Sequence, residues 1–264
     1  MSEERVKIGI QGLDQMMGGG LIPGSICAII GTYGTGKTTF ALRFIWEGLV
    51  SGDNVIYISL EEREERIYRY MEQKGWDISP YIGKSLNVIK LDPLDFNLAI
   101  DSLKNELPQL VRKLDAKRVV IDPISLFEDL FEKDSNRRRE MFRFVDELRD
   151  QKCTLVLTSE TDSHDSFASR HNLVEYLADS VIVLRYVRPS DLTSVHLALE
   201  VVKMRLSAHS REIKPYEIQE GQVLVYTEAN VFWIPPIPSR CIIMMSNAPG
   251  IPPRAQKSTV TRSI

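Results

Sequence analysis

Residues 31–38 read Gly-Thr-Tyr-Gly-Thr-Gly-Lys-Thr, and they match the pattern G-x-x-x-x-G-K-[ST] at every specified position. An apolar run over 26–30 precedes them, and a helical pattern over 38–50 follows, so a chance glycine-rich turn is the weaker interpretation. Glycines allow successive backbone N–H groups to converge on an anion, and a helix start adds the positive end of its dipole. The stretch therefore predicts a strand, a phosphate-binding loop and a helix in succession.

Short apolar runs rich in β-branched residues alternate with helical patterns along most of the chain. The runs cover 26–30, 55–60, 86–91, 118–121, 154–157 and 181–184. The helical patterns cover 38–50, 63–74, 96–114, 137–151 and 173–177. Continuous apolar runs suit strands buried on both faces, so we expect an α/β fold with a mainly parallel central sheet flanked by helices. Strand patterns at 195–204, 212–219 and 222–225 predict a C-terminal antiparallel extension of that sheet.

Composition and charge limit the kinds of protein that this chain can be. The chain has 264 residues, 43% of them hydrophobic, and a formal net charge of −3, which is ordinary for a globular protein and does not favour general polyanion binding. Six of the 13 prolines lie beyond residue 228, and residues 254–264 hold three cations and no acid. We expect one domain over 1–228 and a proline-rich tail over 229–264 that is extended or disordered by itself.

The cysteines and the N-terminal residues suggest where such a chain works. The three cysteines are far apart and lack C-x-x-C spacing, so no zinc site is expected, and Cys27 and Cys153 should be small core residues. Residues 1–7 lack the apolar core of a signal peptide, and no stretch approaches the roughly 18–20 apolar residues of a membrane span. These features predict a cytoplasmic protein without membrane contact.

The phosphate loop and a later strand supply candidate ligands for a nucleotide and its metal. The loop contributes Gly34, Thr35, Gly36, Lys37, Thr38 and Thr39. We expect Lys37 to hold the β- and γ-phosphates and the Thr38 hydroxyl to bind Mg²⁺. Asp122 ends the apolar run 118–121 and should act on Mg²⁺ through a water. The alternative for Asp122 is a strand-capping residue before Pro123.

Two acids follow the apolar run 55–60 and are candidates for the catalytic base. Glu61 and Glu62 should lie at the carboxyl edge of the parallel sheet, where a carboxylate can orient and deprotonate a water. Ras-type GTPases use glutamine for this purpose, so a glutamate favours ATP hydrolysis. Adjacent strand residues face opposite sides, so we expect one of the two, preferably Glu61, to act. The alternative is the solvated acidic start of a helix over 61–66.

Taken together, these motifs resemble KaiC and, less closely, the RecA/RadA recombinases. The resemblance covers about residues 5–227. It is carried by 9–14 and 18–24, the Glu61-Glu62 pair, 74–77, 157–160, 175–184 and the segment Lys203-Met204-Arg205 with Ser207 and His209. The chain resembles single-domain, archaeal-type members, whereas KaiC itself carries two such domains. The resemblance implies a RecA-like P-loop ATPase that binds Mg·ATP between the subunits of a homo-oligomeric, usually hexameric, ring.

The resemblance also assigns roles to residues outside the phosphate loop. Lys203 and Arg205 match residues that reach a neighbouring subunit's γ-phosphate. On a strand they share one face, with Met204 on the other, and two cations on one face can neutralise developing charge. The alternative is a solvated edge-strand face. Further nucleotide contacts are implied for Gln73, where KaiC has serine, and for Met204, Ser207, His209 and Glu220.

Three downstream functions remain open from the sequence. The first is a nucleotide-dependent switch that signals to partner proteins, with autokinase activity as a variant. Possible acceptors are Ser258, Thr259, Thr261 and Ser263, whose alternative is a plain solubilising tail. The second is a RadA-paralogue that binds single-stranded DNA or a recombinase in repair. The third is a nucleotide-binding protein that hardly turns over.

Loops expected over 124–139 and 160–172 would hold DNA in a RecA-type fold. The first contains Arg137-Arg138-Arg139 among four acids, and the second contains Arg170 among three acids. DNA backbones favour clustered cations and stacking aromatics. Phe127, Phe131 and Phe167 could stack on bases, although such spacing is more typical of a core. The sequence therefore supports DNA binding only weakly.

Overall fold

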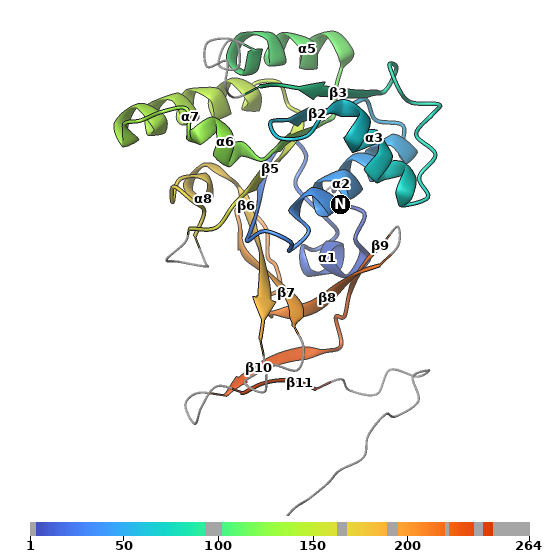
Figure 1. The fold of residues 1–264 in the computed structure, drawn as a ribbon, viewed down its shortest axis with the longest axis vertical. Coiled ribbons are helices and arrows are strands. Elements are labelled where there is room, and N and C mark those ends of the chain that lie inside the picture. The colour runs from blue at the N-terminus through green and yellow to red at the C-terminus, as the bar shows by residue number, and fades with distance from the viewer. Residues whose placement is uncertain are drawn as a thin grey trace, which may run out of the picture.

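A computed structural model describes residues 4–92, 102–162, 168–188, 195–219, 222–234 and 240–244. Its centre is a nine-stranded sheet of order β3-β2-β4-β5-β1-β6-β7-β8-β9 (Figure 1). The strands are β1 Ile26–Gly31, β2 Val55–Ser59, β3 Leu86–Lys90, β4 Arg118–Asp122, β5 Thr154–Ser159, β6 Ser180–Val187, β7 His196–Met204, β8 Lys214–Gln219 and β9 Gln222–Val225. Pairs from β3 to β6 are parallel, and pairs from β6 to β9 are antiparallel. The predicted sheet and its antiparallel extension are confirmed.

Helices cover both faces of this sheet. They are α1 Gln11–Met16, α2 Lys37–Val50, α3 Glu64–Gln73, the π-helix η1 Ser102–Glu106, α5 Leu107–Leu114, α6 Ile124–Glu128, α7 Asp134–Arg149 and α8 Val174–Leu177. The first three pack on one face, and α5 to α8 pack on the other (Figure 1). The helix expected over 96–114 is described only from residue 102.

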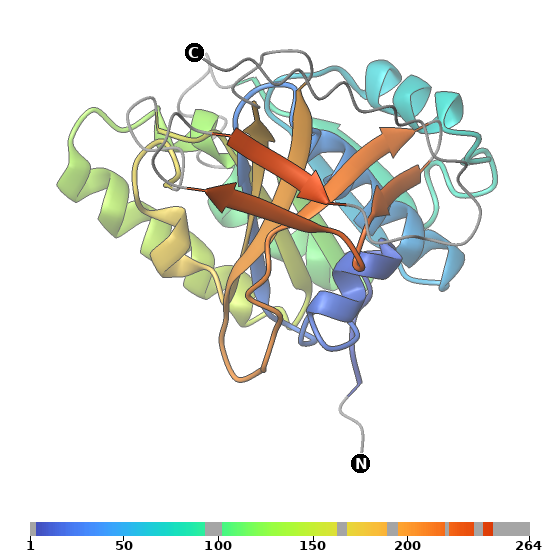
Figure 2. The same ribbon diagram turned by 90° about the horizontal axis from the view of Figure 1, so that it is seen from below.

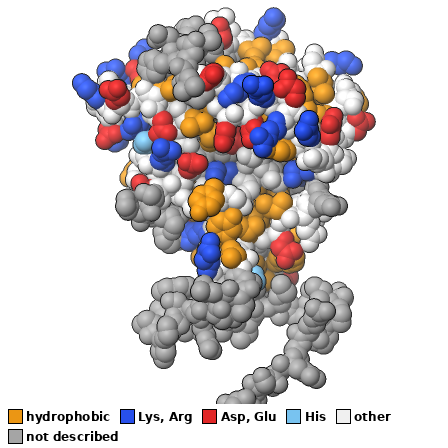
Figure 3. All heavy atoms as spheres, in the orientation of Figure 1, with side chains coloured by type: hydrophobic (Ala, Val, Ile, Leu, Met, Phe, Trp, Pro, Cys, Tyr) orange, Lys and Arg blue, Asp and Glu red, His pale blue; other side chains and the backbone are white. Residues whose placement is uncertain are grey.

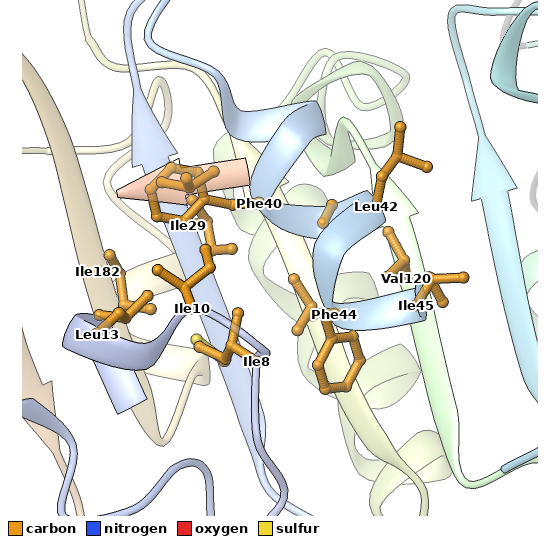
Figure 4. Close-up of a cluster of buried hydrophobic side chains, with 14 of the residues drawn as sticks. Ile8, Ile10, Leu13, Ile29, Phe40, Leu42, Phe44, Ile45, Val120 and Ile182 are labelled. Atoms are coloured by element: carbon orange, nitrogen blue, oxygen red, sulfur yellow. The ribbon is translucent and has the colours of Figure 1, made fainter. Parts of the chain in front are cut away.

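Each central strand contributes to two cores, because successive side chains point to opposite faces. Ile29, Val120 and Ile182, from three different strands, lie in the core beneath α2 with Phe40 and Phe44 (Figure 4). Their neighbours along each strand enter the second core, beneath α5 and α7. This two-sided burial explains the uninterrupted apolar runs of the sequence.

The expected tail begins with a pairing that its proline content did not predict. Strands β10 Asn230–Ile234 and β11 Arg240–Met244 form an antiparallel two-stranded sheet. Strand β10 contacts β8, and Figure 2 shows the pair lying across the lower end of the main sheet. Both strands coincide with the apolar, β-branched runs of the tail, and the intervening prolines fall between them. Residues 245–264 lie outside the described part of the chain.

The topology brings the candidate residues to one edge. Strands β1, β2, β4 and β5 run in the same direction, so the residues that follow them meet at their carboxyl ends. The phosphate loop, the two glutamates and Asp122 all follow or end these strands. Within the described residues, no helix combines the length and apolarity needed to cross a membrane.

Candidate nucleotide-binding site

The phosphate loop connects β1 to α2 through backbone conformations that require glycine. Gly34 and Gly36 have φ angles of 74° and 92°, in the left-handed region. A Cβ on Gly36 would also lie 2.2 Å from Cδ1 of Ile218, and one on Gly34 would lie 2.3 Å from the Tyr186 hydroxyl. The Thr35 hydroxyl donates to the Thr32 carbonyl at 2.7 Å and ties the loop to itself. Glycine is therefore needed here both for conformation and for space.

The antiparallel extension supports this loop from behind. The buried Tyr216 of β8 donates its hydroxyl to the Thr35 carbonyl at 2.5 Å. Its ring packs edge-on against Phe40 of α2, with centroids 5.3 Å apart. Because Tyr216 comes 181 positions after Thr35, no local pattern could have indicated this contact. The extension is thus a structural part of the site.

The side chain of Lys37 folds back onto the phosphate loop. Its Nζ donates to the carbonyls of Gly31 and Thr32, at 2.9 and 3.2 Å. Burial lowers the pKa of Lys37, and the nearby carboxylates of Glu160, Asp122 and Glu61 oppose that shift. The side chain therefore places a cation beside the loop among acidic groups.

A cavity of about 460 Å³ opens beside the loop, between α2 and α3. Its walls are Thr38, Thr39, Leu42, Ser59, Glu61, Glu62, Tyr70, Gln73, Lys74 and Asp122. This volume lies within the range of small-molecule and cofactor sites. The predicted metal ligands, both candidate bases and Gln73 therefore share one cavity.

Asp122 faces α2 and is held by two hydroxyl groups. Tyr57 of β2 donates to its Oδ2, and Thr158 of β5 donates to its Oδ1. Neither donor was identified from the sequence, although Tyr57 lies within the apolar run 55–60 and Thr158 directly follows the run 154–157. Asp122 is only 7% exposed, yet it reaches the cavity that also contains Thr38. It is therefore more than a cap on its strand.

The donors present fit a magnesium ion held partly by phosphate. Among the described residues, no three histidine, cysteine or acidic side chains form a metal-binding group. The predicted metal ligands, the carboxylate of Asp122 and the hydroxyl of Thr38, are two of the oxygen-bearing side chains that line the cavity. Mg²⁺ in nucleotide sites is commonly bound by one or two protein oxygens, with substrate phosphates and water completing the shell. The pair therefore suits Mg²⁺ on a nucleotide better than a protein-only metal site.

The structure corrects the expected orientation of the two glutamates. Strand β2 ends at Ser59, so Glu61 and Glu62 lie in a bend where strand alternation no longer applies. Both line the cavity rather than facing opposite sides. Glu62 pairs with Arg66 at 3.2 Å, and its backbone N–H donates to the Ser59 hydroxyl at 2.8 Å. No ion pair of Glu61 is found among the described residues, which leaves its carboxylate the freer of the two.

Lys203 and Arg205 lie near the amino-terminal ends of the parallel strands, whereas the phosphate loop lies at their carboxyl ends. Met204 pairs with Ser180, which pairs with Cys27 at the start of β1. The loop follows Gly31, four residues along the same strand, which corresponds to about 13 Å at roughly 3.3 Å per residue. Neither cation can therefore reach the phosphate loop of its own chain.

Both cations converge on the end of α8, although β7 ends at Met204 and Arg205 lies in the turn that follows it. Lys203 donates to the carbonyls of Glu175 and Ala178, both at 2.7 Å. Arg205, 48% exposed at its side chain, donates to the Tyr176 carbonyl at 3.1 Å and lies 3.4 Å from Asp179. Lys203 is thus firmly held, whereas Arg205 remains accessible.

The other implied nucleotide contacts divide between the two edges. Gln73 lines the cavity, whereas Met204, Ser207 and His209 belong to the segment at the opposite edge. Met204 is 7% exposed and its side chain packs in the core. Nε2 of His209 is buried without a hydrogen-bond partner among the described residues. Glu220 lies outside the described residues.

The expected DNA loops are largely folded against the protein. Most of 124–139 forms α6 and the start of α7, so it is not a loop. Arg137 donates to the carbonyls of Glu128 and Phe131 and pairs with Asp134. Phe127 and Phe131 are core residues, 0% and 7% exposed.

The remaining candidates for DNA contact and phosphorylation are limited. Arg170 of the second loop pairs with Asp129 and Glu160, each at 3.3 Å. On the face shown in Figure 3, cations and acids are interspersed. Phe167 lies outside the described residues, as do the tail hydroxyls Ser258, Thr259, Thr261 and Ser263.

Comparisons with known proteins show which proteins this chain is similar to. A family model described as "ATPase: KaiC" matches residues 6–230. The chain is 32% identical over 251 residues to a UPF0273 protein of Methanopyrus kandleri, covering 86% of this chain and 94% of that protein. The crystal structure of a KaiC-like protein from Pyrococcus horikoshii is similar with a TM-score of 0.75 at 30% identity, covering 84% of this chain and 99% of that chain.

Some relatives, the proteins described as circadian clock oscillator protein KaiC, are much longer than this chain. The protein of that name from Parathermosynechococcus lividus is 29% identical over 227 residues, which are 83% of this chain. The match covers 41% of that protein, so the chain spans less than half the length of this relative.

Proposed function

This chain belongs to the KaiC family of ATPases, and from that premise we propose that it binds Mg·ATP in the cavity between α2 and α3 and hydrolyses it. One observation carries the proposal: the phosphate loop's Thr38, the acid Asp122 and the Glu61-Glu62 pair all meet in a single cavity. The family supports a RecA-type nucleotide-binding ATPase, and the proposal adds the metal, the reaction and the residues.

Binding would depend on the loop and on Lys37. Backbone N–H groups from Gly34 to Thr39 surround the phosphates, at the start of α2 where the helix dipole favours negative charge. Lys37 exchanges its contacts with the loop carbonyls for phosphate oxygens. Thr38 and Asp122 would hold Mg²⁺, which neutralises phosphate charge when it is bound.

Hydrolysis would depend on Glu61 or Glu62. Either carboxylate can accept the proton of a water that attacks the γ-phosphate, because both line the cavity. We assign this role to Glu61, because Arg66 neutralises Glu62 and Ser59 fixes its backbone. Glu62 then positions the turn that carries Glu61.

A ring would complete the site with cations from a second copy. Lys203 and Arg205 lie on the sheet edge away from their own loop, so the nucleotide they could serve belongs to a neighbour. A head-to-tail arrangement places this edge against the phosphate edge of the next subunit, and such interfaces close into rings. Arg205 would then stabilise charge that develops during phosphoryl transfer.

We propose that such a ring acts as a nucleotide-dependent switch, because nucleotide at a subunit boundary makes the interface respond to hydrolysis. The direct test is ATP turnover of the purified protein with and without single-stranded DNA, using Lys37→Ala as the blank. Turnover above the blank and indifferent to DNA is expected. Turnover equal to the blank would refute hydrolysis, and strong stimulation by DNA would favour the RadA-type role instead.

A further inference from the structure

Each carboxylate oxygen of Asp122 accepts a hydrogen bond from one hydroxyl group. The phenol of Tyr57 donates to Oδ2, and the hydroxyl of Thr158 donates to Oδ1. Tyr57 and Thr158 are both 0% exposed, and Asp122 is 7% exposed. Three consecutive members of the sheet, β2, β4 and β5, therefore contribute one polar side chain each to a single buried group.

Strand register explains why these three side chains meet. Asp122 lies opposite Ser59 of β2, so Tyr57 is its diagonal neighbour two residues back. On the other side, Ile121 pairs with Leu157, which places Thr158 next to Asp122. The parity of each strand directs all three toward α2, which begins with Lys37 and Thr38.

The two hydroxyls restrict what Asp122 can do. A carboxylate can accept about four hydrogen bonds, two on each oxygen. In Asp122 each oxygen accepts one, from Tyr57 or from Thr158. The side chain cannot rotate without breaking both hydrogen bonds, so its remaining positions stay directed at the cavity shared with Thr38. A tyrosine phenol and a threonine hydroxyl each carry one proton to donate, and both are given to Asp122.

We propose that Tyr57 and Thr158 are positioning residues for the metal, and that they fix Asp122 in the orientation in which it supports Mg²⁺ on the bound nucleotide. The inference rests on the proposed Mg·ATP binding and goes one step beyond it. Tyr57 touches neither nucleotide nor metal and acts through Asp122. Residues that orient metal ligands in this way typically change metal affinity 10–100-fold when they are replaced.

The test is Tyr57→Phe, which removes one oxygen atom and leaves the ring packing in place. Binding of a fluorescent ATP analogue is measured while Mg²⁺ is titrated, and again in EDTA. We expect the Mg²⁺ concentration at half-saturation to rise about tenfold. Affinity in EDTA should stay within about twofold of the wild type, because no contact to phosphate is lost. Thr158→Val should shift the Mg²⁺ titration in the same direction.

Thr154→Val is the matched control, since it removes a buried hydroxyl from the other end of the same strand. The Thr154 hydroxyl accepts from the Gly24 N–H at 3.1 Å, away from Asp122. This variant should lose stability but keep the wild-type Mg²⁺ titration. It therefore separates a general loss of packing from a loss of metal positioning.

Two results would overturn the inference while leaving Mg·ATP binding intact. The first is a Tyr57→Phe titration that coincides with that of the wild type. The second is an equal loss of affinity with and without Mg²⁺, which would make the hydroxyl a support of the cavity wall. A wild-type affinity that ignores Mg²⁺ is distinguishable from both, because it refutes the magnesium part of the proposed function itself.

Discussion

Replacing Glu128 by glutamine should make the stability of this protein less dependent on pH. Glu128 ends α6 and is 0% exposed, and neither of its carboxylate oxygens has a hydrogen-bond partner among the described residues. Burial raises its pKa from 4.5 to about 8. The nearby acids Glu175 and Asp129 act in the same direction, and Arg137 and Arg170 oppose it. The folded protein therefore keeps this carboxyl neutral at pH 7.

The direction of the pH effect on unfolding free energy follows from the number of protons that the folded and unfolded states bind. Between pH 4.5 and about 8, folded Glu128 holds a proton that the unfolded chain has lost. Rising pH therefore favours unfolding in this window, by about 1.4 kcal/mol for each pH unit. From pH 5 to pH 7 the wild type should lose about 3 kcal/mol of unfolding free energy through this group. Below pH 4.5 Glu128 is protonated in both the folded and the unfolded state, and above about pH 8 it is ionised in both. Outside this window the unfolding free energy therefore no longer changes with pH through this group.

Glu128→Gln keeps the shape of the neutral carboxyl and cannot ionise. Unfolding by urea is measured for both proteins at pH 5, 6 and 7, without nucleotide and at equal protein concentration. The variant should gain about 3 kcal/mol relative to the wild type between pH 5 and pH 7. Asp14, whose pKa burial raises to about 6, affects both proteins equally and cancels in the comparison. A constant difference in unfolding free energy across this range would contradict the prediction, because Glu128 would then titrate alike in the folded and unfolded states.

Two other predictions concern catalysis. Arg205→Ala should keep nucleotide affinity, because Arg205 is proposed to act on charge that develops only during phosphoryl transfer, and should slow turnover about 100-fold or more. Binding of a fluorescent nucleotide and single-turnover hydrolysis measure the two effects, and normal hydrolysis would exclude Arg205 from the reaction. Glu61→Gln should lower hydrolysis by about 10²–10⁴-fold with ATP binding retained, and Glu62→Gln should lower it less. The reverse order in the same assay would transfer the role of base to Glu62.

Local patterns predicted the parts of this site that lie within single elements. The glycines at 34 and 36 are required by backbone angles and by the closeness of Ile218, and the motif located them correctly. The central strands were recognisable because burial on both faces demands continuous apolar runs. Asp122 was identifiable because it is the polar end of such a run; it lines the cavity, and its role on the metal stays a prediction.

Predictions failed where chain geometry departed from its local rule. Strand alternation placed Glu61 and Glu62 on opposite sides, but the strand ends at Ser59 and a bend turns both into the cavity. The segment 124–139 was expected to be a loop, but its apolar side chains pack into a core as helices. The tail was expected to be extended or disordered by itself, and the pairing of its two apolar runs across the prolines is a contact that this expectation did not include.

The sequence alone determined the central strands, the phosphate loop and the family resemblance, because these depend on periodicity and on residues close together in the chain. Strand order and register decided the rest. They brought Tyr57 and Thr158 to Asp122, placed Tyr216 behind Thr35, and separated Arg205 from its own loop. Such contacts join positions that lie tens to well over a hundred residues apart, and a one-residue change of register would turn each side chain to the other face. No local sequence pattern specifies strand order and register, because these are set when the strands pair and both faces of the sheet become buried.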